Sequence, residues 1–190
     1  MSVRIIACGA VAREVRAVAG QLPAFELRCI PATLHNHPER IVPAVEAILN
    51  EGGAEKTVLA LGDCGTGGGL DRLCAERGVE RLPGAHCYAF FAGLPEFAAL
   101  MEAEPGTFFL TDFLARQFDT LVWQALGLDR KSELRDIYFA HYTRLVFLSQ
   151  TEDPALLAKA KDAAARLCLR FEHRPTGLHQ FARELARLAA

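Results

Sequence analysis

The sequence predicts an α/β fold: a Rossmann-like layered structure in which helices flank a mainly parallel sheet. Short apolar runs alternate with stretches of helical periodicity from one end of the chain to the other, as is typical of βα units. The run TVLAL at 57–61 is nearly all apolar and is bounded by turn residues, which indicates a strand covered on both faces. The chain has 190 residues, about the length of one domain, so we expect a single α/β domain over 1–190.

The first half of the chain is predicted to consist of βα units in regular succession. Val11, Val15 and Val18 recur at helical spacing until Gly20, and Pro38 stands where a helix can begin. A glycine-rich loop after 61 leads into a helix that carries Leu70, Leu73 and Cys74. The strands expected in this half cover residues 3–7, 25–30, 57–61 and 79–82.

The second half is predicted to be more helical. Thr111 or Asp112 is the expected cap of a long helix that runs through Leu126, and an Ala-rich stretch at 154–167 has an amphipathic pattern. The other expected elements are helices at 95–101 and 178–188 and strands at 107–110, 144–148 and 168–171.

Composition and charge exclude several classes of protein. Hydrophobic residues make up 51% of the chain and charged residues 23%, which favours a globular fold over disorder. Lys and Arg number 21 against 23 Asp and Glu, for a net charge of −2, so we expect no nucleic-acid partner. No apolar run approaches the roughly 20 residues that span a bilayer, and no export signal precedes the first strand. We therefore expect a cytoplasmic protein with no membrane partner.

The six cysteines divide into two groups. In a reducing compartment, thiols serve in metal binding, catalysis or packing rather than in disulfides. Cys29 lies in an expected strand, Cys74 on an expected helix and Cys168 beside an expected strand, so we assign these three to core packing. Cys8, Cys64 and Cys87 instead stand at turns.

Four residues at successive turns form a candidate metal site: Cys8 in IIACGA, His35 in LHNHP, Cys64 in LGDCGTGGG and Cys87 in PGAHCY. The first three follow expected strands, and α/β proteins place their ligand sites at that edge of the sheet. Three thiols and one imidazole make a complete ligand set for tetrahedral zinc, and iron(II) is the alternative. If one of the four is displaced, the open position permits catalysis.

Neighbouring residues are candidates for supporting roles, although a simpler interpretation exists. Asp63, His37 and His86 stand beside the predicted ligands and can orient or replace them. The alternative is that Cys8 and Cys64 are small buried residues under helices and that His35 caps a loop.

The glycine-rich segment after Cys64 suggests two further properties. Gly65, Thr66 and Gly67 precede a helix, and backbone amides in such a loop can bind an anion, although the segment lacks the Lys-Ser/Thr ending of a phosphate-binding P-loop. A thiol at a helix N-terminus has a lowered pKa, so Cys64 is the expected reactive sulfur and the candidate catalytic residue.

The chain as a whole resembles a prokaryotic family known as domain of unknown function 1638. The resemblance rests on IIACG with Glu14 following, LHNHP, LGDCGTGG, Cys87 before an apolar stretch that ends at Gly93, and PGTFFLT at 105–111. Members of that family carry an acidic residue where this chain has His86. Glu14 joins the candidate supporting residues on this basis.

The resemblance implies no established reaction. Such proteins look like companions of corrinoid-dependent methyltransferases and one-carbon enzymes, which implies a corrinoid protein or methyltransferase as partner and a small thiol or methylated compound as substrate. A metal held by thiolates can bind a substrate thiol and lower its pKa.

Three functions therefore stay open at the level of sequence. The first is a metal-binding protein, with zinc or Fe²⁺ held by Cys8, His35, Cys64 and Cys87, that acts in methyl or one-carbon transfer. The second is a non-enzymatic partner or chaperone of a corrinoid protein. The third is a metal-free enzyme that uses the Cys64 thiol. Whether the protein is an enzyme is left undecided by the sequence.

Overall fold

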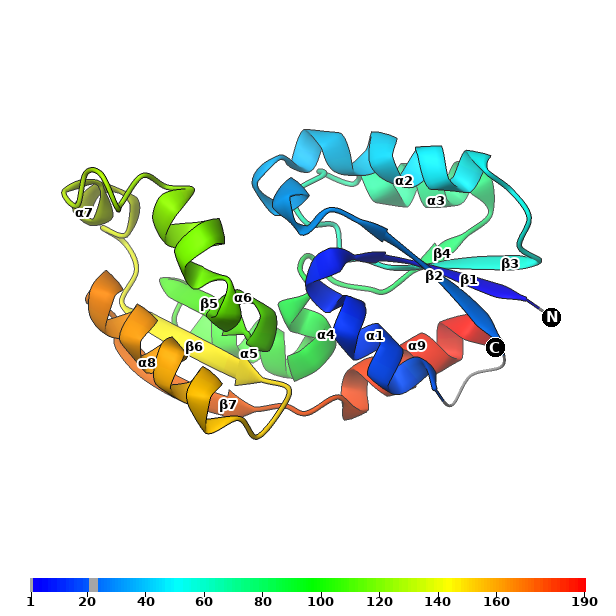
Figure 1. Cartoon of the computed structure of the whole chain (residues 1–190). Coiled ribbons are helices and arrows are strands. Elements are labelled where there is room, and N and C mark those ends of the chain that lie inside the picture. The colour runs from blue at the N-terminus through cyan, green and yellow to red at the C-terminus, as the bar shows by residue number, and fades with distance from the viewer. Residues whose placement is uncertain (1, 21–23) are drawn as a thin grey trace. The chain divides into compact units, whose positions relative to one another are not determined.

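Strands and helices alternate along the chain, which confirms the predicted α/β class (Figure 1). The computed structural model describes residues 2–20 and 24–190. The strands are β1 (Val3–Cys8), β2 (Phe25–Ile30), β3 (Lys56–Ala60), β4 (Glu80–Arg81), β5 (Thr107–Thr111), β6 (Arg144–Ser149) and β7 (Arg170–Pro175). The helices are α1 (Ala12–Ala19), α2 (Ile41–Asn50), α3 (Gly69–Arg77), α4 (Tyr88–Ala92), α5 (Leu94–Ala103), α6 (Asp112–Arg116), α7 (Leu134–Tyr138), α8 (Pro154–Leu167) and α9 (His179–Ala189).

The chain separates into two compact units. The first consists of Met1–Leu94 with Leu178–Ala190, and the second of Pro95–Gly177. Each unit has its own sheet, and the paired strands in both are parallel. The strands expected in one sheet are thus divided between two. This division does not test whether the units fold together, so the single domain over 1–190 stays a prediction.

The sheet of the first unit has the strand order β2-β1-β3-β4. After β2 forms on one side of β1, the chain crosses to the other side to form β3, so the direction of winding reverses between β1 and β3. In open parallel sheets, such a reversal leaves a crevice at the carboxyl ends of the two strands, and ligands bind there. Residue pairs such as Ala7 with Ala60 set β1 and β3 in register up to this edge.

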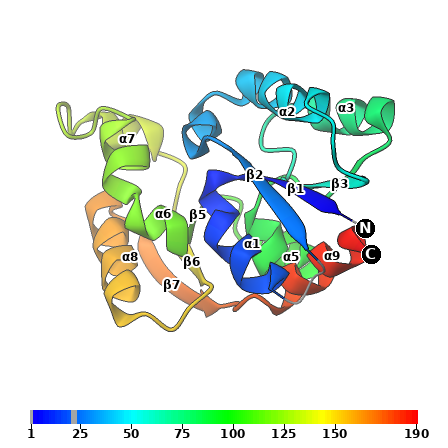
Figure 2. The same cartoon turned by 45° about the vertical axis from the view of Figure 1, so that its right-hand side comes forward.

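Helices cover both faces of the first sheet (Figures 1 and 2). Helices α1 and α9 lie on one face, over a core that includes Ile5, Ala7 and Phe181. Helices α2 and α3 lie on the other, over a core that includes Ile6 and Leu59. Alternate residues of β1 thus point to opposite cores, as strand geometry requires.

The second unit has a sheet with the order β5-β6-β7, and every residue of β6 is buried. The turn after β5 is fixed by the buried side chain of Asp112. One oxygen of its carboxylate accepts from the backbone N–H of Gln150 (3.1 Å), and the other from the Thr151 hydroxyl (2.5 Å). The Asp112 N–H donates to the Gln150 side chain (2.9 Å). These bonds join the carboxyl ends of β5 and β6.

Three sequence-based expectations about the second half are corrected. The long helix expected over 112–126 is broken into α6 and a π-helical segment, Asp119–Gln124, although Thr111 caps α6 as predicted. The strand expected at 168–171 begins later, as β7. Cys168 was expected to pack in the core, yet it is exposed, because it ends α8 in a left-handed conformation (φ 57°).

The packing role assigned to Cys29 is also wrong, whereas that of Cys74 is confirmed. Cys29 is exposed, because β2 lies at the edge of its sheet. Cys74 is buried on α3 and belongs to the core beneath α2 and α3.

Within the described ranges, no helix combines the length and the apolar character needed to cross a bilayer.

Candidate functional site

Three cysteines gather at the carboxyl edge of the first sheet. Cys8 is the last residue of the central strand β1, Cys64 follows β3 by four residues, and Cys87 is the residue before α4. Cys8 and Cys64 therefore stand at the point between β1 and β3 where the winding reverses, which is where doubly wound sheets bind ligands. We call these three side chains the thiol cluster.

Backbone hydrogen bonds bring the segment around Cys64 beside the segment before Cys87. The N–H of Asp63 donates to the carbonyl of Gly84 (3.1 Å), and the N–H of Cys64 donates to the carbonyl of Ala85 (2.8 Å). Gly62 allows this approach, because a Cβ atom there would stand 3.1 Å from the backbone of His86. Residues 62–64 and 84–86 thus run side by side.

Cys8 shares one hydrophobic core with each of the other two thiols. Cys8 and Cys87 pack against the core beneath α1 and α9, and Cys8 and Cys64 pack against the core beneath α2 and α3. The Cys8 sulfur also accepts a hydrogen bond from the N–H of Ala10 (3.4 Å). Cys8, at the end of β1, therefore contacts the cores on both faces of the sheet.

The thiols are close enough to affect one another's ionisation. The pKa of Cys64 is raised to about 11, mainly by burial and next by the neighbouring Cys8, against backbone hydrogen bonds from Gly62 and Cys87 that lower it. Burial also raises the pKa of Cys87 well above its usual value, followed by the charges of Cys64 and Cys8. The pKa of Cys8 is raised mainly by burial. Without a bound cation, all three are neutral thiols at pH 7.

The lowered pKa expected for Cys64 is therefore wrong. The expectation placed this thiol at a helix N-terminus, but α3 begins at Gly69, five residues later. The helix dipole acts only within about one turn of the terminus, so burial decides the direction of the shift. A metal-free enzyme that uses an activated Cys64 thiolate is disfavoured by this result.

The backbone at Cys64 is strained. Its φ of 50° lies in the left-handed region, and Gly65 follows with a φ of 84°. A side chain with a Cβ in this region costs roughly 1–2 kcal/mol relative to its usual conformations. Residues held in this way cluster at ligand and active sites, which marks Cys64 as a candidate functional residue on a second, independent ground.

Asp63 organises the glycine-rich loop. Its carboxylate accepts from the Thr66 hydroxyl (2.5 Å) and from the N–H groups of Gly67 (3.1 Å) and Gly68 (2.9 Å). This differs from the anion site expected at Gly65, Thr66 and Gly67. The Thr66 hydroxyl and the Gly67 N–H, which would bind an external anion there, already donate to the Asp63 carboxylate.

Replacing Asp63 with alanine is expected to lower the free energy of unfolding at pH 7 by about 1–2 kcal/mol, because three hydrogen bonds of the loop are lost. The pKa of Asp63 is lowered: burial opposes the shift, but hydrogen bonds from Thr66, Gly68 and Gly67 outweigh it. Its contribution is therefore present above the ordinary Asp pKa of about 3.9 and is lost as the pH falls through the folded-state value. Urea denaturation of both proteins between pH 7 and roughly pH 3 measures the difference.

Asp63→Asn is the matched control, since it keeps an acceptor oxygen but cannot ionise. The difference in the free energy of unfolding between Asp63→Asn and the wild type should, like that for Asp63→Ala, become smaller as the pH falls. A difference between Asp63→Ala and the wild type that does not change with pH would contradict the role given to the charge.

Burial lowers the pKa of both His35 and His86. His86 precedes Cys87, and burial lowers its pKa, against the charge of Asp63, which raises it. His35 lies on a 3₁₀ turn, Ala32–Asn36, and burial followed by the charge of His86 lowers its pKa. Both imidazoles are therefore neutral at pH 7, the form that can bind a metal.

Two other predicted supporting residues lie at different positions. The Nδ1 atom of His37 lies 3.6 Å from a carboxylate oxygen of Glu39, and the His37 side chain is 57% exposed. Glu14 is buried in the first turn of α1.

The residues of the thiol cluster do not form a preassembled metal centre. Across the described residues, 2–20 and 24–190, no group of three or more His, Cys, Asp and Glu side chains is already arranged to hold a metal ion. The donor chemistry suits a soft cation, but binding would require the side chains to turn from the positions they hold here.

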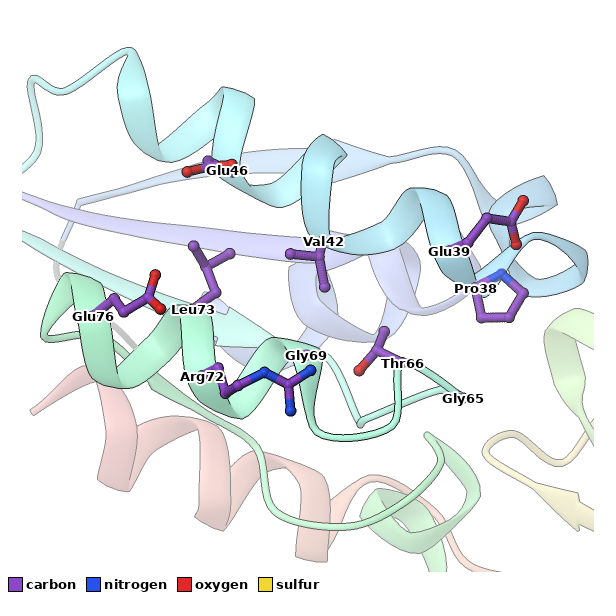
Figure 3. Close-up of a pocket in the computed structure, with 10 residues that line it drawn as sticks. All are labelled: Pro38, Glu39, Val42, Glu46, Gly65, Thr66, Gly69, Arg72, Leu73 and Glu76. Carbon is purple, nitrogen blue, oxygen red and sulfur yellow. The ribbon is translucent and has the colours of Figure 1, made fainter.

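A separate pocket of about 540 Å³ lies beside the glycine-rich loop, between α2 and α3 (Figure 3). Its apolar lining includes Val42 and Leu73, and the Arg72 guanidinium extends from α3 toward the glycine-rich loop that carries Thr66. Gly65 and Thr66, two of the three predicted anion-binding residues, line this pocket.

Sequence reasoning missed Arg81, which fixes the segment before Cys87. Its guanidinium donates to the carbonyl oxygens of Leu82 (2.8 Å) and Gly84 (3.1 Å) and pairs with Asp71 (2.6 Å). Gly84 is also the acceptor for Asp63, so Arg81 helps to hold the two segments together. An arginine in a short strand carries no motif that would have revealed this role.

Fold and site together define an α/β protein with a cysteine-rich edge at the switch point of a doubly wound sheet. The sequence matches the family "Protein of unknown function (DUF1638)" over residues 29–185, and the chain belongs to that family. No curated protein and no solved structure matches it.

Proposed function

We propose that the protein binds a soft metal ion, zinc or iron(II), through the thiolates of Cys8, Cys64 and Cys87. The observation that carries the proposal is the gathering of three thiols from separate segments at the switch point of the first sheet. Three thiolates held this close would repel one another, which keeps the cysteines protonated. A bound cation neutralises that repulsion, so metal binding releases the thiol protons. Zinc affinity should therefore increase as the pH rises.

The fourth position belongs to an imidazole or to a substrate. His86 is adjacent to Cys87 in the chain, and His35 interacts with His86. A histidine in this position closes the site, whereas a displaced histidine leaves room for a ligand. His35 is the ligand predicted from the sequence, and His86, which the sequence offers as a possible replacement, competes with it.

The test is metal analysis of the full chain, purified under reducing conditions without added metal and then titrated with Zn²⁺. We expect about one zinc or iron per chain and stoichiometric loss in Cys64→Ala. Cys29→Ala and Cys168→Ala are matched controls, because both thiols are exposed and lie outside the cluster, and they should keep the metal. A folded wild type that binds no added Zn²⁺, or a Cys64→Ala protein that keeps full occupancy, contradicts the proposal.

The reaction class that suits such a site is methyl transfer to a small thiol. A metal held by Cys8, Cys64 and Cys87 would lower the pKa of a substrate thiol in the fourth position, and the thiol proton would pass to solvent. The resulting thiolate would accept the methyl group, and the donor would keep the electron pair of the bond that breaks. The family resemblance supplies the proposed donor, a corrinoid protein or methyltransferase. Pull-down of purified corrinoid protein with the wild type and with Cys8→Ser tests the partner separately: complex formation supports it, and its absence overturns it.

A further inference from the structure

We propose that Cys64 and Cys87 form an intramolecular disulfide when the protein meets a disulfide oxidant, and that this bond competes with the metal. The competition rests on the proposed function. Formation of the disulfide does not, because it depends only on the approach of the two segments that carry these cysteines.

The backbone supports this pair in particular. The Cys64 N–H bonds to the carbonyl of Ala85, two residues before Cys87. The N–H of the preceding residue, Asp63, bonds to the carbonyl of Gly84 (3.1 Å), and Cys64 is close enough to Cys87 for its charge to add to burial in raising the pKa of Cys87. Two backbone hydrogen bonds, from Asp63 and Cys64, thus tie this segment to the one that leads into Cys87.

Cys8 is the competing partner for Cys64. Packing and charge connect Cys8 with Cys64. The Cys64 N–H, however, bonds to Ala85 and not to the segment of Cys8. The Cys8 sulfur is also engaged by the Ala10 N–H. Cys64 is therefore expected to react with Cys87 rather than with Cys8.

Gly62 makes the approach possible. A methyl group at this position would meet the backbone of His86 at 3.1 Å, so the 62–64 segment would have to move away from the 84–86 segment. Disulfide geometry tolerates little displacement, because the two Cβ atoms must stand about 3.5–4.5 Å apart. Gly62→Ala therefore tests the geometry without removing a thiol.

The chemistry is ordinary thiol–disulfide exchange with an oxidant such as glutathione disulfide. One protein thiol loses its proton, attacks the oxidant as a thiolate, forms a mixed disulfide and releases one glutathione thiolate. The second protein thiolate attacks the protein sulfur of that mixed disulfide and releases the other. The two protons pass to the two glutathiones, the oxidant gains two electrons, and the cysteine pair loses them. Only Cys8 of the thiol cluster would then remain as a thiolate ligand.

The experiment exposes the reduced, metal-free full chain to glutathione disulfide and identifies the products by intact mass and peptide mapping. We expect a cross-link between the peptides that contain Cys64 and Cys87 in most molecules, and a yield at least several-fold lower in Gly62→Ala. Cys29→Ser and Cys168→Ser are controls that should leave the cross-link intact. Mixed disulfides with glutathione at Cys64 and Cys87, free thiols at both, or a Cys8–Cys64 bond would overturn the proposal.

A second arm separates this inference from the proposed function. Zn²⁺ added to the reduced protein before the oxidant should suppress the cross-link, and the oxidised protein should bind no Zn²⁺. A cross-link that forms equally with and without Zn²⁺ overturns the competition and leaves the disulfide standing. Metal binding without any cross-link overturns the disulfide and leaves the proposed function standing.

Discussion

Replacing Phe181 with alanine is expected to lower the free energy of unfolding of the first unit by about 3–5 kcal/mol. The Phe181 side chain is fully buried on α9, with ring centroids 6.2 Å from Phe90 and 5.5 Å from Phe91 of α4. The substitution removes buried apolar surface and leaves a cavity that a packed core fills only in part. The same core supports Cys8 and Cys87, so the proposed metal binding should weaken along with stability.

Two probes make this experiment informative about the whole chain. The single tryptophan, Trp123, belongs to the second unit, so its fluorescence follows that unit, whereas far-UV circular dichroism follows both. Coincident urea transitions in Phe181→Ala would support a single folding domain, and separated transitions would contradict it. Ile137→Ala is the control, because a 67% exposed side chain should change stability by no more than about 0.5 kcal/mol. A change that small in Phe181→Ala itself would show that its packing was misjudged.

Replacing Asp112 with alanine is expected to cost the second unit about 2–4 kcal/mol. The side chain is fully buried, and its loss leaves the Gln150 N–H and the Thr151 hydroxyl without their acceptor. A buried donor that loses its partner carries the full desolvation penalty, and hydrogen bonds to a charged group are the stronger kind. Trp123 fluorescence during urea denaturation measures the change.

Asp112→Asn separates the hydrogen bonds from the charge. The amide keeps one acceptor oxygen for the Gln150 N–H, so we expect less than half of the alanine effect. Asp136→Ala is the surface control, since that side chain is 70% exposed. Equal losses in Asp112→Ala and Asp112→Asn would contradict the weight given to the backbone hydrogen bond.

Local patterns predicted individual elements well. Helix α8 occupies the predicted residues, with Asp153 accepting from the N–H groups of Ala155 and Leu156 at its start. The break after α6 was missed, because a π-helical segment of six residues is too short for its i→i+5 pattern to be told from that of an α-helix by apolar periodicity. The division of the strands between two sheets was also missed, since apolar periodicity identifies a strand but not the strand with which it pairs.

The position of the thiol cluster was predictable from the sequence, but the ionisation of its thiols was not. The ends of parallel strands meet at one edge whatever the details of the loops, so Cys8 and Cys64 could be brought together from sequence alone. The ionisation of Cys64 could not, because it depends on burial by residues that are distant in sequence. Cys29 illustrates the same limit: FELRCI predicts a strand, but only the sheet order shows that this strand lies at the edge.

The left-handed turn at Cys64 also limits how this protein can be made more stable. Glycine would occupy that turn without the conformational penalty, so Cys64→Gly is a substitution that thermostability engineering would favour. It would also remove a sulfur from the edge of the sheet. Selection for heat resistance alone should therefore lead to a more stable chain that lacks one of the proposed metal ligands, as expected when stability is gained at the expense of a functional site.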